Sequence, residues 1–255
     1  MRGYVSLAIP VRTADGVDAV LKVPQKSHLD DDERHEVLAL RTWAGEGAVR
    51  LLDHSADERV LLLEKLVPGH GLHHEPIDSA VAIAGALLRR LAVPAPAGLK
   101  VTLAASAATM LDRLPERWRR QGEPVPRAAL DRALAYCAKL GPKADNLLVN
   151  YGQHFENVLA ARREPWLVID PTVLAGDVEF GALALVWNRA DVVDGPDGAL
   201  RRLDAIVAAA ELDRDRALGW TLVRAVDAWL WSLEVDPDHE QARWCPLIVE
   251  GIMGS

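Results

Sequence analysis

A lysine inside an otherwise apolar segment is the residue whose chemistry stands out first. Lys22 lies in the run 19–24, whose composition is typical of a buried strand. A lysine in that setting can protect the edge of a sheet with its ammonium group in water. It can also bind phosphate groups when a carboxylate holds it in place, and Glu36 lies on the helix predicted next. The residue types alone leave both interpretations open.

An asparagine and an aspartate further along the chain form a second candidate set. Asn157 ends a polar segment that begins at Asn150, and Asp170 follows the apolar run 166–169. Two such residues at the ends of adjacent short strands can converge on one point, and their oxygens suit Mg²⁺, a cation normally shared with substrate phosphates. The alternative is that Asn157 caps a turn and Asp170 caps a helix. The additional presence of Lys22 favours the metal interpretation.

These residues fall on a strand-rich first part and a mainly helical second part. The first part is predicted to hold a helix at 30–43 and strands at 4–11, 18–23, 49–52 and 60–66. The second is predicted to hold a β-rich stretch at 147–170 and helices at 77–91, 103–114, 127–140, 180–188, 200–210 and 214–233. Proline and glycine near Gly69 indicate the boundary. The expected fold class is α+β, with lobes at 1–68 and 69–255.

The composition is that of a globular protein and argues against several functional classes. The chain has 255 residues, of which 50% are hydrophobic and 26% charged, and its formal net charge is −8. An acidic chain argues against nucleic-acid binding. Cys137 and Cys245 lie far apart in the sequence without metal-like spacing, which argues against a zinc site or a disulfide framework. No apolar run reaches the roughly 18 residues of a membrane span and no secretory signal opens the chain, so we expect a cytoplasmic protein without a membrane partner.

Four segments together resemble a known family, and one of them is the predicted helix that contains Glu36. The runs 19–22, 154–159 and 163–171, the last reading Arg-Glu-Pro-Trp-Leu-Val-Ile-Asp-Pro, are similar to those of the aminoglycoside/hydroxyurea antibiotic phosphotransferases, the streptomycin 6-phosphotransferases among them. The resemblance implies a two-lobed protein-kinase-like fold that uses ATP and Mg²⁺ to phosphorylate a hydroxyl of a small, aminoglycoside-like molecule. It also implies that a hinge from Glu64 to Leu66 receives the adenine.

The resemblance further implies a role for each of the residues singled out above. Lys22 would contact the α- and β-phosphates of ATP, and Glu36 would pair with Lys22. Asn157 and Asp170 would hold the magnesium ion.

The chain departs from the family pattern at the catalytic position. Family members carry His-x-Asp-Leu-His-x-x-Asn, whose Asp accepts the proton of the acceptor hydroxyl, and in this register the Asp position is Gly152. Such a base typically contributes about 10²–10⁴ in rate, and its loss is expected to leave a small gap. The chain is therefore expected either to phosphorylate an antibiotic weakly or to be an inactive, kinase-like pseudoenzyme that binds nucleotide or antibiotic.

Three nearby groups are candidates for a substitute base. His154 is the better chemical base because of its imidazole side chain, although in this fold that histidine usually packs as a structural support. Glu156 and Asp177 are the nearest carboxylates in the sequence. Glu156 is expected to point away from the gap at Gly152.

The start of the chain and several other clusters have plainer interpretations. Family members carry a substantial segment ahead of this start, so the N-terminal lobe is predicted to lack its first strand and part of the phosphate loop. The strand at 4–11 would then be an exposed edge and a route to a homodimer. We expect a solvated basic helix face, loop histidines and core tryptophans elsewhere. These are Arg113, Arg117, Arg119 and Arg120; His70, His73 and His74; and Trp220, Trp229 and Trp231.

Overall fold

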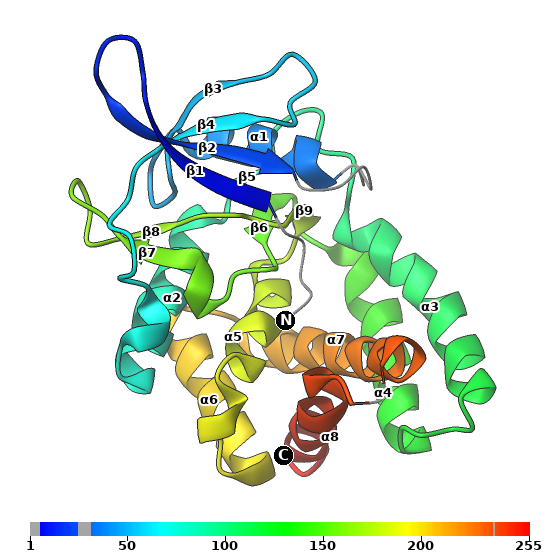
Figure 1. Cartoon of the computed structure of the whole chain (residues 1–255). Helices are drawn as coiled ribbons and strands as arrows, with labels where there is room; N and C mark the ends of the chain where they lie inside the picture. The colour runs from blue at the N-terminus through cyan, green and yellow to red at the C-terminus, as the bar shows by residue number, and fades with distance from the viewer. Residues whose placement is uncertain (1–5, 25–31, 237) are drawn as a thin grey trace.

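The computed structural model describes residues 6–24, 32–236 and 238–255. Its N-terminal part is a four-stranded antiparallel sheet in the spatial order β1-β2-β4-β3, with helix α1 beside it (Figure 1). The bounds are β1, Ser6–Arg12; β2, Asp18–Pro24; α1, Asp32–Trp43; β3, Leu51–His54; and β4, Leu61–Glu64. The first positions of the strand expected at 4–11 and of the helix expected at 30–43 lie outside the described residues.

Strand β2 is internal to this sheet, and its position decides the environment of Lys22. Lys22 is paired with Ala8 of β1 on one side and with Leu61 of β4 on the other. The hairpin between β1 and β2 turns at Gly16, whose φ of 86° is a conformation that glycine adopts without strain. The interpretation of Lys22 as an edge-strand lysine is therefore wrong.

Two short sheets lie between the four-stranded sheet and the helices (Figure 1). One contains β5, Val93–Pro94, β6, Leu147–Asn150, and β9, Val173–Gly176; the other contains β7, Val158–Ala160, and β8, Trp166–Val168. A parallel bridge between Ala48 and Val168 connects this region to the N-terminal part. The loops of these sheets carry Gly152, Asn157 and Asp170, so the candidate site lies where the two parts of the fold meet.

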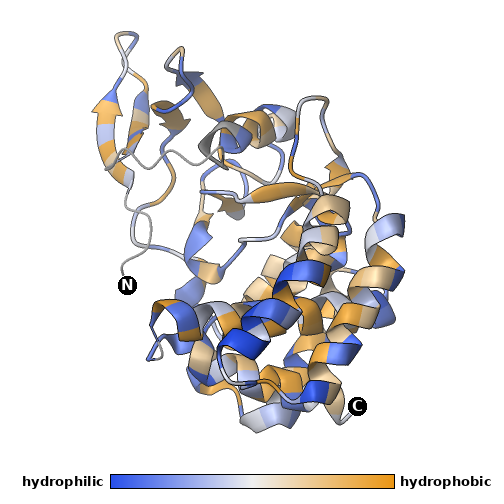
Figure 2. Cartoon of the chain, turned by 90° about the vertical axis from the view of Figure 1, so that its right-hand side faces the viewer, coloured by the Kyte–Doolittle hydropathy of each residue, from blue (hydrophilic) through white to orange (hydrophobic). Residues whose placement is uncertain are grey.

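The C-terminal part is a group of helices packed around α7. The helices are α2, Ile77–Leu91; α3, Leu103–Arg120; α4, Arg127–Leu140; α5, Ala182–Trp187; α6, Gly195–Ala209; α7, Arg214–Val235; and α8, Glu240–Met253. Short 3-10 turns are η1, Leu72–His74; η2, Gly141–Lys143; η3, Phe155–Asn157; η4, Val178–Gly181; and η5, Ala190–Val192. Helix α7 contacts α3, α4, α5, α6 and α8. Apolar and polar residues are interspersed along the helices, as expected when each buries one face (Figure 2).

The architecture confirms the expected α+β class, and two helices differ from the prediction. The helix expected at 103–114 continues to Arg120 with Pro115 inside it. Its last turns are held by Trp118, which is buried and whose Nε1 donates to the carbonyl of Val125 at 2.7 Å. Helix α8 was not expected, because Pro246 interrupts its pattern. No helix among the described residues is long and apolar enough to cross a bilayer.

The basic residues of α3 attach that helix to α7, so the expected solvated face is wrong for most of them. Arg113 and Arg117 bind Asp227 at 2.8 and 3.1 Å. Arg117 also binds Glu234 at 3.0 Å, and Arg120 pairs with the same carboxylate. These ion pairs join α3 to α7.

Candidate active site

Lys22 meets two carboxylates that come from distant parts of the chain. Its Nζ lies 2.6 Å from Oε2 of Glu36 on α1 and also pairs with Oδ1 of Asp170, which follows β8. The Lys22 side chain is 16% exposed, whereas that of Asp170 is 54% exposed. A strand, a helix and a loop of the C-terminal part thus bring three charged residues together. The two separate sets expected from the sequence form one cluster.

The charge of Lys22 is maintained by its partners. Burial, the largest single influence, lowers the pKa of its ammonium group, but the carboxylates of Glu36 and Asp170 outweigh burial and raise that pKa above its usual value. Lys22 is therefore a cation at any physiological pH. A permanently charged, mostly buried ammonium beside an exposed carboxylate is well suited to bind an anionic group at this point.

Asn157 lies next to Asp170, in agreement with the idea that the two act together. The Nδ2 atom of Asn157 donates to the backbone carbonyl of Asp170 at 3.4 Å, and the amide of Ile169 donates to the carbonyl of Asn157 at 2.8 Å. Asp170 has a φ of 50°, a left-handed conformation that aspartate tolerates better than most residues. No group of three or more His, Cys, Asp or Glu residues within the described ranges can hold a metal. One carboxylate and one amide oxygen suit Mg²⁺, which is usually bound through few protein ligands and substrate phosphates.

The position expected to carry the catalytic carboxylate is not a gap. Gly152 follows β6, and a Cβ atom built on it would lie 2.9 Å from both Cβ and Oγ1 of Thr172. The backbone around Thr172 is fixed, because its amide donates to Oδ1 of Asn150 at 3.1 Å and its carbonyl accepts from the amide of Tyr151 at 2.9 Å. The expectation of free space at Gly152 is therefore wrong, because the side chain of Thr172 occupies that space.

His154 forms a polar chain with Glu156 and Asn188. Its Nδ1 lies 2.9 Å from Oε2 of Glu156, and the Nδ2 of Asn188 donates to the same oxygen at 3.0 Å. Asn188 also accepts from the amide of Phe155 at 2.7 Å, so it holds the loop that carries both residues. The His154 side chain is 40% exposed and is not packed as a structural support. Sequence reasoning missed the role of Asn188, because it lies more than thirty residues away.

The hydrogen bond from His154 lowers the pKa of Glu156 to about 2, although burial opposes this shift. A carboxylate with so little proton affinity is a poor general base near neutral pH. Because Glu156 accepts, it favours the proton of His154 on Nδ1 and leaves the lone pair on Nε2. This arrangement leaves Nε2 of His154 able to accept a hydrogen bond from a ligand.

A cavity of about 850 Å³ lies beside these residues. Gly152, His154, Glu156 and Thr172 line one end of it. Glu156 therefore faces the same cavity as Gly152, in contrast to the expectation that it points away. Other lining side chains come from α5, the segment that follows it through η5, α7, the α7–α8 connection and α8, and include Trp187, Arg189, Asp191, Arg224, Asp238 and Glu240. Its volume is ample for a small-molecule ligand.

The sequence matches one family over most of its length. The model of the Aminoglycoside/hydroxyurea antibiotic resistance kinase family matches residues 1–236. The chain belongs to this family. Streptomycin 6-kinase of Streptomyces griseus is 38% identical over 238 residues, covering 91% of this chain and 76% of the relative. Hydroxyurea phosphotransferase of Kitasatospora aureofaciens is 39% identical over 242 residues, covering 92% and 68%. By family, the protein is a phosphotransferase with a hydroxyl group as acceptor.

Solved structures share the fold of this antibiotic resistance kinase. A thermostable mutant of aminoglycoside phosphotransferase APH(4)-Ia has a TM-score of 0.64 at 17% identity, covering 100% of this chain and 94% of that one. Choline kinase LicA from Streptococcus pneumoniae also has a TM-score of 0.64, at 11% identity, covering 97% and 90%. At these identities the likeness concerns the fold alone, and it confirms the expected two-lobed, kinase-like architecture.

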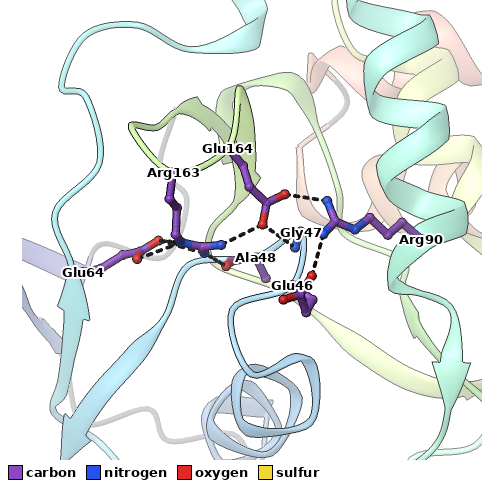
Figure 3. Close-up of polar contacts among 7 residues, drawn as sticks. All are labelled: Glu46, Gly47, Ala48, Glu64, Arg90, Arg163 and Glu164. Carbon is purple, nitrogen blue, oxygen red and sulfur yellow. Dashed lines mark hydrogen bonds and ion pairs between the residues drawn. The ribbon is translucent and has the colours of Figure 1, made fainter.

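In this antibiotic resistance kinase, the predicted hinge is held by an arginine of the C-terminal part (Figure 3). Arg163, in the turn between β7 and β8, binds both carboxylate oxygens of Glu64 at 3.0 Å through Nε and donates through Nη2 to the carbonyl of Ala48 at 2.6 Å. The side chain of Glu64 is thereby committed to Arg163. Leu66 packs against the core, and the amide of the following residue, Val67, donates to Ala160 in β7 at 3.0 Å.

The neighbouring glutamate extends this network to α2 (Figure 3). Glu164 accepts from Nη1 of Arg163 at 2.7 Å and pairs with Arg90, which in turn binds Glu46 at 2.8 Å. Arg163 and Glu164 therefore connect the segment after α1, strand β4 and helix α2. Their role is structural, because their ion pairs hold the two parts of the fold together.

The remaining sequence candidates have structural roles. Asp177 is fully buried, accepts from Nε1 of Trp220 and the amide of Asp145 at 2.7 Å each, and pairs with Arg216. It is not a catalytic base. Trp220 is core, as expected, whereas Trp231 is 40% exposed and lines a second cavity.

Proposed function

We propose that the chain transfers the γ-phosphoryl group of ATP to a hydroxyl of an aminoglycoside-like antibiotic. Streptomycin is the acceptor that the names of its relatives suggest. The convergence of Lys22, Glu36 and Asp170 carries the proposal, because phosphoryl transfer depends on an anchored cation and a metal-binding carboxylate at the phosphates. A cavity large enough for the acceptor lies beside the same loops.

The nucleotide would be held by residues of both lobes, for which we propose the bounds 1–68 and 69–255. Lys22, held by Glu36, would bind the α- and β-phosphates, and Asn157 and Asp170 would hold Mg²⁺. A bound magnesium ion would neutralise negative charge on the phosphates of ATP. Because Arg163 engages the side chain of Glu64, we assign the adenine contacts of the hinge to its backbone and to Leu66.

His154 is proposed as the base in place of the missing carboxylate at Gly152. Its Nε2 would accept the proton of the acceptor hydroxyl while the acceptor oxygen bonds to the γ-phosphorus and the bond from that phosphorus to the oxygen of the leaving ADP breaks. Glu156 would stabilise the resulting imidazolium. The short contact between Nδ1 of His154 and Glu156 supports this orientation. Glu156 and Asn188 are positioning residues in this scheme.

A binding protein without catalysis is the second candidate function. Gly152 has no side chain, and Thr172 fills the space that a carboxylate would need. This observation favours a pseudoenzyme that binds nucleotide or antibiotic. Both candidates are consistent with a cytoplasmic location, which we propose because ATP is plentiful there.

A homodimer through β1 is a further part of the proposal. Strand β1 is an edge of the four-stranded sheet, and Leu7 and Ile9 on it are 47% and 36% exposed. An exposed edge with apolar side chains can pair with a second copy. Light scattering tests the proposed dimer by measuring the molar mass of the protein in solution. The mass of a monomer at every protein concentration would contradict the proposal.

The test is a phosphoryl-transfer assay with Mg²⁺–ATP and either streptomycin or hydroxyurea, with the product identified by mass spectrometry. Lys22→Met is expected to abolish product formation, whereas Lys139→Met, a change of an exposed lysine on α4, should not. His154→Gln should lower kcat by about 10²-fold or more while leaving ATP affinity unchanged. ATP binding without any phosphorylated product would favour the pseudoenzyme.

A further inference from the structure

An arginine in the wall of the acceptor cavity lies in an aromatic cage. The Cζ atom of Arg224, on α7, is 4.8 Å from the ring centroid of Phe180, 5.4 Å from that of Tyr151 and 5.8 Å from that of Trp187. These rings come from three different segments: η4, the loop after β6 and the end of α5. Cation–π contacts of this kind hold a guanidinium in place without neutralising its charge.

Arg224 has no carboxylate partner within the described residues. Its one hydrogen bond there goes from Nη1 to the carbonyl of Phe180 at 2.7 Å, although a guanidinium has five N–H donors. The nearby Asp227 is engaged by Arg113 and Arg117. Desolvation lowers the pKa of Arg224 to about 10, so the group is still a cation at neutral pH. A desolvated charge without a counter-ion is costly unless a ligand completes its hydrogen bonds.

The remaining face of Arg224 is directed into space that a ligand can enter. The residue lines both the cavity of about 850 Å³ beside Gly152 and an adjoining cavity of about 340 Å³ that reaches Trp231. The larger cavity is also lined by the exposed carboxylates of Asp191, Asp238 and Glu240 and by two further arginines, Arg189 and Arg243. The cavity therefore offers carboxylates as well as the guanidinium of Arg224 to a ligand.

We propose that Arg224 is a specificity-determining residue, which donates hydrogen bonds to an uncharged oxygen-rich end of the acceptor. The acceptor class is a polyhydroxylated or carbonyl-bearing molecule whose cationic groups, where present, pair with the cavity carboxylates of Asp191, Asp238 and Glu240. Charge-assisted hydrogen bonds from a preorganised guanidinium are stronger than neutral ones. This inference rests on the proposed acceptor site, and it adds which end of the bound acceptor lies at Arg224.

The test measures binding alone, by calorimetric titration of the full chain with streptomycin and with hydroxyurea. Arg224→Gln is expected to weaken binding by about tenfold or more, as for the loss of a hydrogen bond to a charged group. Arg224→Lys keeps the positive charge but lacks the planar, paired N–H donors of a guanidinium. It should therefore bind the acceptor more tightly than Arg224→Gln and more weakly than the unaltered chain. Arg127→Gln is the matched control, because the guanidinium of Arg127 also lies over an aromatic ring, that of Trp118 at 5.5 Å, but it is exposed, pairs with Asp131 and lines neither cavity. It should change binding by less than about threefold.

A structural role alone would lower the thermal midpoint or the ATP affinity of Arg224→Lys, whereas the proposal expects neither to change. Equal or tighter binding by Arg224→Gln would overturn the proposal, since the guanidinium would then be neutral or repulsive to the acceptor. If the unaltered chain bound neither probe, the acceptor class of the proposed function would be wrong, and the role of Arg224 would be lost with it. Phosphorylation of streptomycin by an Arg224→Gln chain of unchanged affinity would preserve the proposed function and refute this inference only.

Discussion

Restoring a carboxylate at Gly152 tests whether the altered catalytic loop limits the reaction. In a chain changed only by Gly152→Asp, the new Cβ would lie 2.9 Å from two side-chain atoms of Thr172, where ordinary contacts begin near 3.4 Å. Threonine is short and branched, so it cannot swing away without moving its backbone. Overpacking of this kind costs about 1–3 kcal/mol. The single variant is therefore expected to be destabilised.

The second change, Thr172→Gly, removes both clashing atoms. In the double variant the carboxylate can take the position from which a kinase base acts, and a base of this kind contributes about 10²–10⁴ in rate. Part of that contribution is already supplied by His154 in our scheme. We therefore expect turnover of the double variant to exceed that of its control by at least about tenfold.

The control is the pair Gly152→Asn and Thr172→Gly, which has the same shape and hydrogen-bonding length but no basic carboxylate. ADP release with streptomycin gives turnover, and calorimetry gives Mg²⁺–ATP affinity for both double variants. Thermal melting should show a lower midpoint for Gly152→Asp alone, by about 2–4 °C for each kcal/mol lost. Equal turnover of the Asp and Asn double variants would refute the reasoning, because the carboxylate would then be irrelevant.

Three further outcomes follow from the contacts. Arg163→Met should lower the free energy of unfolding by about 2–3 kcal/mol in denaturant titrations, and the exposed control Arg127→Met by less than about 1 kcal/mol. Trp220→Phe should cost about 1–3 kcal/mol by unpairing a buried carboxylate oxygen. Because its pKa is depressed to about 2, Glu156 should stabilise the chain above about pH 4.5, and its advantage over Glu156→Gln should vanish as the pH falls towards 2.

Local patterns in the sequence were sufficient to predict most of the elements. The helices at Ile77–Leu91 and Arg127–Leu140 have clear apolar spacing and begin and end as predicted. Lys22 and Glu36 were predicted to pair because a phosphate-binding lysine needs a carboxylate that holds it in place, and Nζ of Lys22 lies 2.6 Å from Oε2 of Glu36. The structure adds that Asp170 joins this pair, which follows only from the way the two parts of the fold meet.

Tertiary contacts could not be read from the same patterns. Thr172 fills the space beside Gly152 because the pairing of β6 with β9 brings it there, and nothing in its local sequence indicates this. Arg224 lies in a helix whose pattern predicts only an amphipathic helix, while its cage is built from three separate segments. The roles of such residues depend on which distant segments meet, and spacing along the chain does not encode that.

The most direct test of the nucleotide site is the affinity for ATP of the unaltered chain and of Asp170→Asn, measured by calorimetry with Mg²⁺ and again with EDTA. With Mg²⁺, the variant is expected to bind ATP at least about tenfold more weakly, because a metal-binding carboxylate is lost. With EDTA, it should bind as well as the unaltered chain or better, because Lys22 is released from an ion pair. Asp204→Asn, at an exposed pair on α6, should behave as the unaltered chain. Equal affinities of Asp170→Asn and the unaltered chain in the presence of Mg²⁺ would contradict the account.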